Sequence, residues 1–365
     1  MTILMVGIVL AIVGTICALC LILTGRKLFK FRILRDWCHE NKKRKRIVIA
    51  IYLAIVILFG VLDFINTLIV MIHLTVFFFI ADFVGFLLKR KIPQERYWTG
   101  LIALVVCVGY LGFGWYQAHH VRETDYEIKT AKDIHEDLTV VQITDAHVGA
   151  TFDGDGFAEH LKKIQAVNPD LVVVTGDFVD DSTSREDMQK SCEALGALQT
   201  KYGIYLVWGN HDRGYYRSEE FTFTELKQEL RRNQIHILED EVVEIGEDYY
   251  LAGRLDRSFS TRKTAQELLD GLDDSRYVIM LDHQPNDFDA ESETIADLVL
   301  SGHTHGGQMF PIGWTGVWSG LNDRTYGMEE RNDTTFVVSS GISDWAIRFK
   351  TATFSEYVVL HIGKQ

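Results

Sequence analysis

The sequence predicts an α/β domain preceded by an N-terminal region of transmembrane helices. Residues 1–118 are strongly apolar with basic patches, whereas the remainder of the 365-residue chain is polar and holds the acidic excess behind the net charge of -13. After residue 137, short apolar runs that read as buried strands alternate with segments of helical periodicity. Because strand–helix–strand order implies parallel pairing, this part is expected to be an α/β sheet domain.

The N-terminal part contains apolar runs that are long enough to cross a bilayer. Residues 3–24 carry no charge, and no basic residue precedes them, which favours a span over a cleaved signal peptide or a buried core helix. Residues 47–88 are about twice as long as one span, and Asp63 and Asn66 near their middle predict a tight helical hairpin. One long span with a surface helix is the alternative. The predicted spans are residues 3–24, 47–63, 67–88 and 98–118.

The basic residues predict how these spans are oriented. Residues 25–46 hold ten Lys and Arg and residues 89–96 hold four, while the hairpin between them holds none. By the positive-inside rule both basic loops are cytoplasmic, so the chain is expected to be a multi-pass cell-membrane protein with an extracytoplasmic catalytic domain. Residues 26–37 mix cations with apolar side chains, and either bind anionic membrane lipids or act only as a topology signal.

The polar part begins with a predicted juxtamembrane linker over residues 119–137, followed by the catalytic domain over residues 138–365. Helical periodicity is present in residues 157–168, 184–202 and 222–233, and the pattern becomes richer in strands from about residue 235. An acidic domain argues against nucleic acid as a partner, because phosphate backbones attract Lys and Arg. The polar part has a single cysteine, Cys192, and therefore no disulfide framework.

Potential metal ligands follow five of the strand-like runs. Ligands at the ends of neighbouring strands converge at one edge of an open α/β sheet. Any one of these histidines alone would more often be a hydrogen-bonded core residue, but together they are too many for one ion and suit two ions that share a bridging carboxylate. The candidate ligands are Asp145, His147, Asp177, Asn210, His283, His303 and His305.

The order of these residues resembles the motif series of the calcineurin-like metallophosphoesterase family. The family blocks D-x-H, G-D, G-N-H-D, H and G-H-x-H all occur here in order, and the resemblance covers about residues 138–362. The longer motif GHTHGGQ at residues 302–308 resembles a bacterial membrane-associated branch. The resemblance implies a four-layer α/β/β/α sandwich with its site along one edge of the paired sheets.

The resemblance also implies a role for each site residue. His211 would donate a proton to the leaving oxygen or stabilise developing charge. Asp212 would orient His211, with capping of a turn as the alternative. The first metal ion would be held by Asp145, His147, Asp177 and His305, and the second by Asp177, Asn210, His283 and His303.

The expected function is that of a membrane-anchored phosphoesterase with two divalent metal ions, which Mn, Zn or Fe could supply. Two such ions about 3.5–4 Å apart hold a bridging hydroxide and clamp a phosphoryl oxygen, so that phosphate ester or pyrophosphate bonds are hydrolysed. Tethering to the membrane favours a lipid-linked or envelope phosphate as substrate. The alternatives are a nucleotide phosphodiesterase, and a membrane sensor or transporter whose phosphoesterase-like domain only binds.

One position departs from the branch that the sequence resembles. Ser340 stands where that branch usually has an arginine, which implies a difference in substrate contacts. Arg254 and Arg324 are candidates to replace that arginine, and each is otherwise an ordinary surface residue.

Overall fold

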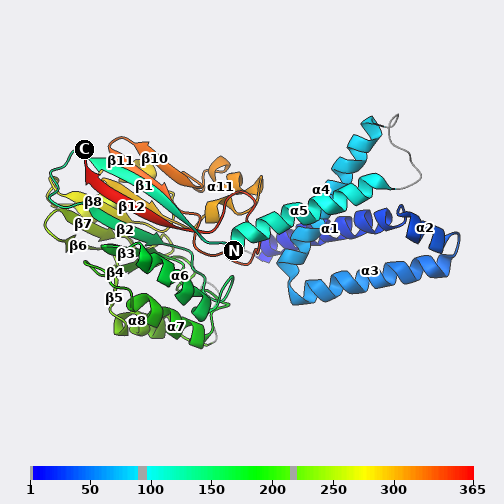
Figure 1. Cartoon of the computed structure of the whole chain (residues 1–365), viewed down its shortest axis with the longest axis horizontal. Helices are drawn as coiled ribbons and strands as arrows, with labels where there is room; N and C mark the ends of the chain where they lie inside the picture. Colours follow the sequence, from blue (N-terminus) through cyan, green and yellow to red (C-terminus); the bar gives the residue numbers. More distant parts are fainter. Residues whose placement is uncertain (1–2, 89–96, 214–219) are drawn as a thin grey trace. The chain divides into compact units, whose positions relative to one another are not determined.

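The computed structural model describes residues 3–88, 97–213 and 220–365, which leaves the second basic loop, residues 89–96, outside the described residues. The chain divides into two compact units, Met1–Phe113 and Gly114–Gln365. Figure 1 traces both units along the sequence.

The first unit consists of helices, and the four long ones expose many large apolar side chains. Four helices of the chain are long and apolar enough to cross a membrane within the part that the structure describes, as the sequence predicted. The predicted hairpin has its break at Asp63, whose carboxylate accepts a hydrogen bond from the backbone N–H of Asn66. The helices are α1 (Ile3–Leu28), the short α2 (Arg32–Cys38), α3 (Lys42–Leu62), α4 (Phe64–Leu87) and α5 (Trp98–His119), whose last turns belong to the second unit.

The second unit is built on two mixed six-stranded sheets. From one edge of the sheet to the other, the strand order of the first sheet is β1-β12-β2-β3-β4-β5, and that of the second is β10-β11-β9-β8-β7-β6. The strands of the first sheet are β1 (Arg122–Thr130), β2 (Leu138–Ile143), β3 (Leu171–Thr175), β4 (Ile204–Val207), β5 (Ile235–Ile237) and β12 (Glu356–Lys364). Those of the second are β6 (Glu241–Ile245), β7 (Tyr249–Gly253), β8 (Tyr277–Leu281), β9 (Leu298–Ser301), β10 (Gly327–Arg331) and β11 (Thr334–Val338).

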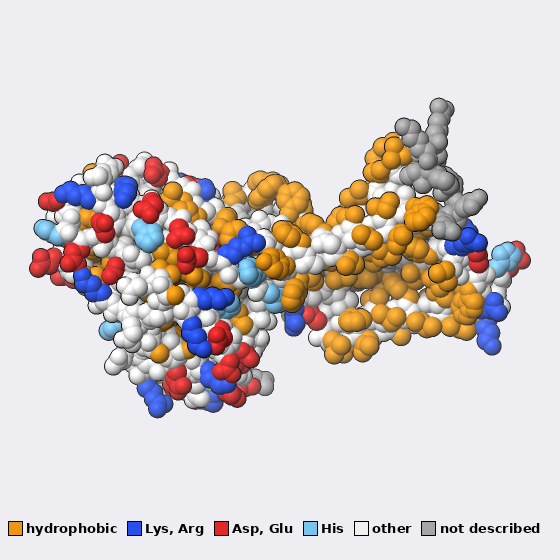
Figure 2. All heavy atoms as spheres, viewed as in Figure 1, with side chains coloured by type: hydrophobic (Ala, Val, Ile, Leu, Met, Phe, Trp, Pro, Cys, Tyr) orange, Lys and Arg blue, Asp and Glu red, His pale blue; other side chains and the backbone are white. Residues whose placement is uncertain are grey.

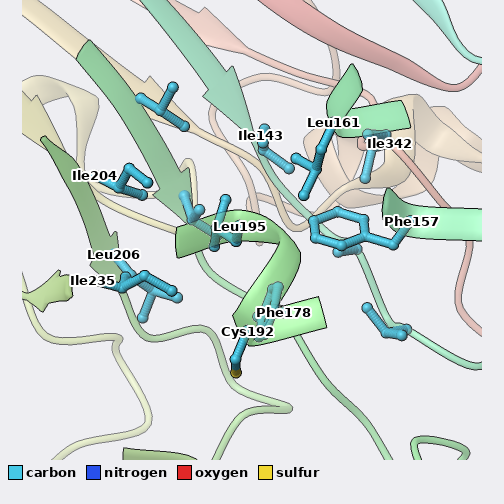
Figure 3. Close-up of a cluster of buried hydrophobic side chains, with 14 of the residues drawn as sticks. Ile143, Phe157, Leu161, Phe178, Cys192, Leu195, Ile204, Leu206, Ile235 and Ile342 are labelled. Atoms are coloured by element: carbon cyan, nitrogen blue, oxygen red, sulfur yellow. The ribbon is translucent and has the colours of Figure 1, made fainter. Parts of the chain in front are cut away.

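The central strands are continuously apolar because both of their faces are covered. Successive side chains of a strand point to opposite faces. Val140 of β2 accordingly packs in the core between the sheets, together with Leu251 and Ile279 of the second sheet. Its neighbour Val141 packs in the outer core beneath the helices that connect the parallel strands β2 to β5, where Phe157 also lies (Figure 3). These helices are α6 (Gly154–Ala166), α7 (Arg185–Gly196) and α8 (Phe223–Arg232).

The outer face of the second sheet is covered in the same way by two short helices, α9 (Ala265–Leu269) and α10 (Phe288–Glu291). Val278 and Met280 of β8 pack there against Leu268 of α9 and Phe288 of α10. The order of layers is therefore helices, sheet, sheet, helices, and the predicted four-layer sandwich is confirmed.

The segment predicted as a linker contains a strand of the first sheet. Residues 122–130 form β1, which pairs in parallel with β12 from Arg122 opposite Glu356 to Thr130 opposite Lys364. Its exposed positions are polar and alternate with partly or fully buried ones, as expected of an edge strand. The folded part thus begins before residue 138.

A fragment that starts at Leu138 should therefore be less stable than one that starts at Val121. The shorter fragment loses β1 and the burial of Ile128, which is 5% exposed in the structure. Burial of one such side chain contributes about 1.5–3 kcal/mol, so the free energy of unfolding should fall by at least about 2 kcal/mol. Urea denaturation of both fragments measures this, and equal midpoints would show that β1 adds no stability.

Candidate metal centre

All seven candidate ligands lie just beyond the carboxyl ends of parallel strands. Asp145 and His147 follow β2, Asp177 follows β3, and His283 follows β8. Because the two sheets pack face to face, the ends of β2 to β4 and of β8 and β9 meet at one edge of the sandwich. Asn210 follows β4, and His303 and His305 follow β9.

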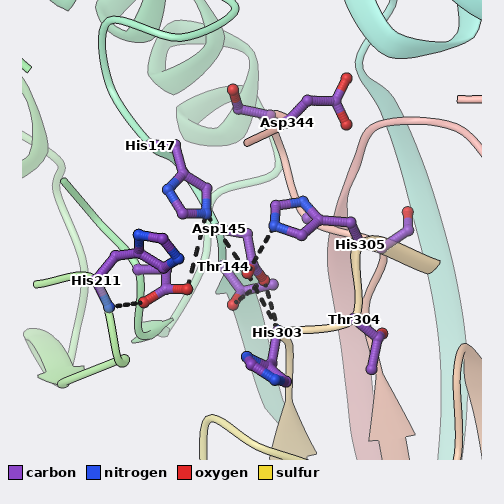
Figure 4. A network of polar contacts seen from close by, with 12 residues as sticks. Thr144, Asp145, His147, His211, His303, Thr304, His305 and Asp344 are labelled. Carbon is purple, nitrogen blue, oxygen red and sulfur yellow. Dashed lines mark hydrogen bonds and ion pairs between the residues drawn. The ribbon is translucent and has the colours of Figure 1, made fainter. Parts of the chain in front are cut away.

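The structure brings six of these residues into two groups with metal-binding potential. Within each group the ligand atoms all lie within 4.8 Å of one another. Figure 4 shows His147 and His305 directed toward Asp145 from different loops. The first group is Asp145, His147 and His305, and the second is Asp177, His283 and His303.

The Asp177 carboxylate lies between the two groups. Its Oδ2 atom is 3.1 Å from Nε2 of His283 in its own group and 3.7 Å from Nε2 of His147 in the other. Its Oδ1 atom accepts a hydrogen bond of 2.8 Å from the backbone N–H of His211. One oxygen is thus fixed by the backbone, and the other is shared by both groups.

Contacts at Nδ1 turn the Nε2 atoms of two histidines toward the carboxylates. Nδ1 of His283 lies 2.7 Å from the carbonyl oxygen of Thr175, which can only accept, so the proton is on Nδ1. Nδ1 of His147 lies 3.2 Å from Oδ2 of Asp180. Such partners commonly orient metal-bound histidines, and they leave the Nε2 lone pair free for an ion.

The electrostatics of this cluster favour a positive charge between the ligands. Burial raises the pKa of the Asp177 carboxyl, but His283 and His147 outweigh burial and hold that pKa well below its usual range. Conversely, burial lowers the pKa of His283, yet Asp177 raises it well above its ordinary value. The Asp177–His283 pair therefore favours a bound proton, which supplies positive charge beside the carboxylate. A metal ion held by the same side chains can supply that positive charge in place of the proton.

Two other ligands have the properties of neutral donors. Burial lowers the pKa of His305 to about 3 and also lowers that of His303, so both rings are neutral. Oδ1 of Asn210 is buried without a hydrogen-bond partner among the described residues. A buried acceptor without a partner is costly, and an ion would satisfy it. The donor set therefore fits two divalent metal ions.

The ligand loops have a strained backbone. Left-handed φ angles, rare for residues with a side chain, occur at Asp145 (51°), Asp177 (50°) and His303 (69°). Such conformations cost on the order of 1–3 kcal/mol each and persist where the surroundings enforce them, commonly at functional sites. His147 and His305 also have positive φ angles.

His211 lies beside the first ligand group, and Asp212 lies within a turn. The His211 ring lies between those of His147 and Trp345, with centroid distances of 5.0 and 5.2 Å. Asp212 accepts hydrogen bonds from the backbone N–H groups of Phe178, Val179 and Gly209, all between 2.8 and 3.0 Å. These contacts match the alternative, a turn-capping carboxylate, which joins the Asn210 loop to the Asp177 loop.

Sequence reasoning missed Asp180 and did not foresee that Arg254 is buried. Asp180 stands three residues after Asp177 in the run TGDFVDD, and only this spacing could have indicated its contact with His147. Arg254 is 2% exposed and forms ion pairs with Asp282 and Glu291. It is therefore not placed to replace the arginine that usually stands at the position of Ser340. The side chain of Arg324 hydrogen-bonds its own loop and Glu329.

The fold and the two ligand groups define a two-sheet α/β protein with a pair of candidate metal sites at one sheet edge. A family model described as calcineurin-like phosphoesterase matches residues 138–307. An uncharacterized metallophosphoesterase of Aquifex aeolicus is 31% identical over 207 residues, which cover 54% of this chain and 75% of that protein. The chain therefore belongs to the calcineurin-like metallophosphoesterase family.

Two further relatives match longer segments. An uncharacterized metallophosphoesterase of Campylobacter jejuni is 32% identical over 253 residues, 67% of this chain and 64% of that protein. A protein of Danio rerio named as a transmembrane protein with metallophosphoesterase domain is 30% identical over 231 residues, 60% of this chain and 52% of that protein. The chain spans less than two thirds of the length of these two relatives.

Gly209→Ala should empty the centre of metal. A Cβ atom at this position would lie 2.1 Å from Oδ1 and 2.4 Å from the backbone nitrogen of Asp177, so the carboxylate and its loop must shift. Gly109→Ala in α5 is the control, because a Cβ there meets nothing within 4 Å and the glycine has no positive φ angle. Elemental analysis of both variants after loading with Mn²⁺ should show metal in the control only. An equal metal content would mean that the Asp177 position is not critical.

Proposed function

We propose that this chain is a membrane-anchored phosphoesterase that uses two divalent metal ions to hydrolyse phosphate ester or pyrophosphate bonds. The observation that carries the proposal is the position of Asp177 Oδ2, within 3.1 Å of one histidine of the second ligand group and 3.7 Å of one of the first. A carboxylate oxygen shared in this way suits a bridging ligand between two ions.

The proposed ligand sets add one residue to each of the two groups: a bridging carboxylate to the first and a side-chain amide to the second. Asp177 completes the first set, and Asn210 completes the second through its buried Oδ1 atom. His, Asp and Asn donors accept Mn, Zn or Fe. The first ion is then held by Asp145, His147, Asp177 and His305, and the second by Asp177, Asn210, His283 and His303.

When bound, two such ions neutralise the charge on the phosphoryl group and lower the pKa of bound water. The chain's own residues keep the ligands in place and supply a proton. Thr175 and Asp180 orient the rings of His283 and His147. His211 lies beside the first ligand group, next to the His147 ring, where its imidazole N–H can donate to the leaving oxygen. Asp212 keeps the loop that carries His211 against the Asp177 loop.

Hydrolysis of synthetic phosphate esters tests this function. Full-length protein in detergent, stripped with a chelator and reloaded with Mn²⁺, Zn²⁺ or Fe²⁺ in turn, should hydrolyse a nitrophenyl phosphate monoester, diester or pyrophosphate with at least one metal. Asp177→Asn should lower the rate more than about 100-fold, since even residues that only orient ligands cost about 10–100-fold.

The exposed Asp274, in the turn before β8, provides the control, and Asp274→Asn should keep its activity. No hydrolysis of any ester with any metal, in protein that has bound two ions, would favour a domain that only binds.

A second prediction separates the proton donor from the ligands. His211→Ala should keep its metals and lose roughly 10²-fold in kcat, the usual scale for general acid catalysis. The loss should shrink for nitrophenol, which leaves without a proton, and grow for alkyl leaving groups. His236→Ala changes an exposed histidine of β5 and should have no effect. An equal loss for both kinds of leaving group would indicate charge stabilisation instead.

We also propose that the catalytic unit lies outside the cytoplasm. The support is the ten Lys and Arg of residues 25–46, which join the first and second candidate spans and are expected to stay inside. With four spans, the chain after α5 then lies on the outer side. A reporter that is active only in the cytoplasm, fused after Gln365, should be silent. Strong reporter activity would show that the catalytic unit lies in the cytoplasm and would contradict this proposal.

A further inference from the structure

Directly after the ligand motif, residues 309–322 form a segment without a single charged residue, and it is mostly exposed after the buried Met309. It includes the short helices η2 (Ile312–Trp314) and α11 (Thr315–Trp318). Figure 2 shows a patch of hydrophobic side chains where Figure 1 places α11. The exposed fractions are 50% for Phe310, 64% for Ile312, 49% for Trp314, 71% for Trp318 and 66% for Leu321.

Elsewhere in the second unit, large exposed hydrophobic residues are few. Among its described residues they are Trp115 and Tyr116 in α5, and Met328 and Trp345. Soluble surfaces rarely gather aromatic and aliphatic side chains in this way without a partner to cover them. Two places therefore stand out: the segment 309–322 and the end of α5.

Hydrogen bonds connect these two places within the second unit. The backbone N–H of Thr351 donates to the carbonyl of Gln308 at 2.9 Å, and Oγ1 of Thr351 accepts from the N–H of Phe310 at 3.1 Å. The preceding N–H, of Lys350, donates to the carbonyl of Gly114 at 2.9 Å. Gly114 belongs to the last turns of α5, the fourth candidate span, so the base of the segment lies beside the point where that span ends.

We propose that residues 309–322 are an interfacial membrane anchor that inserts into the leaflet in which α5 ends. The occupant of this surface is the lipid bilayer, because a segment fixed beside the end of a membrane span is held at the bilayer surface by the chain itself. Trp is enriched at the interface between headgroups and acyl chains, and Phe and Leu are typical of the inserted side of interfacial segments. The absence of charge allows the apolar side to enter this layer.

The anchor has a consequence for the substrate, which rests on the proposed function. His305 lies four residues before Met309, so the insertion holds the ligand loop close to the headgroup layer. Phosphate groups of lipids lie in that layer. The substrate class that this arrangement favours is therefore a phosphate ester carried on a lipid.

Depth-dependent quenching tests the anchor in the full-length chain reconstituted in vesicles of phosphatidylcholine and phosphatidylglycerol. Trp318→Cys and Lys162→Cys place the polarity-sensitive fluorophore NBD at two sites that are each 71% exposed. The unsubstituted chain, whose cysteines are buried except for the partly exposed Cys17, gives the labelling background. Lipids brominated at upper or lower acyl positions serve as quenchers.

NBD at position 318 should lose emission with upper-position bromines more than with lower ones, since interfacial segments enter only about 5–10 Å. NBD at position 162 should keep its emission. Absence of quenching at 318, or equal quenching at both sites, would overturn the anchor. A blue-shifted but unquenched signal at 318 would also overturn it, because protein, such as a second copy of the chain, would then cover the segment.

The substrate class is tested separately with the double variant Trp318→Glu and Leu321→Glu. Its kcat on soluble nitrophenyl phosphate should equal that of the wild type, and its rate on phosphatidic acid in vesicles should fall. Equal rates on phosphatidic acid would reject a lipid-borne substrate. Failure of the wild type to hydrolyse either compound would reject the proposed function, while the quenching result would still decide whether the anchor exists.

Discussion

The Asp177 carboxylate is almost completely buried, with 1% exposure, at the edge where the two sheets meet. A buried anion is costly unless positive charge and hydrogen-bond donors surround it. The first sheet supplies the carboxylate and the backbone N–H of His211, and the second supplies the imidazole of His283. The Asp177 carboxylate can therefore be buried only where the two sheets pack together, because its partners come from both of them.

The same requirement explains the local backbone. Asp145, Asp177 and His303 adopt left-handed conformations that point their side chains into the centre instead of along the strands. A Cβ at Gly302 would lie 2.3 Å from Oδ2 of Asp145, so the GHTH loop can approach β2 only with glycine there. The strain is sustained by a rigid scaffold, because the strands that lead into these loops are buried on both faces.

Much of this could be predicted from the sequence, because strand ends and ligand types are local features. The apolar run before Asp177 predicts a buried strand, and the GNHD and GHTH blocks predict the loops that follow. The contacts of Asp212 could not be predicted, since they join residues more than thirty positions apart through backbone N–H groups. Strand β1 was not predicted because its exposed side chains are charged, which is also typical of a linker. Its partner β12 lies more than 200 residues later in the chain.

The central claim is that Asp177 joins two metal ions in one centre, and electron paramagnetic resonance of the Mn²⁺-loaded protein tests it most directly. Two Mn²⁺ ions that share a bridging ligand are exchange-coupled, and their spectrum differs from that of isolated ions. The account predicts a coupled spectrum at full loading, and isolated-ion signals in Asp177→Asn. A wild-type spectrum of isolated Mn²⁺ alone, at saturating metal, would contradict a bridged pair.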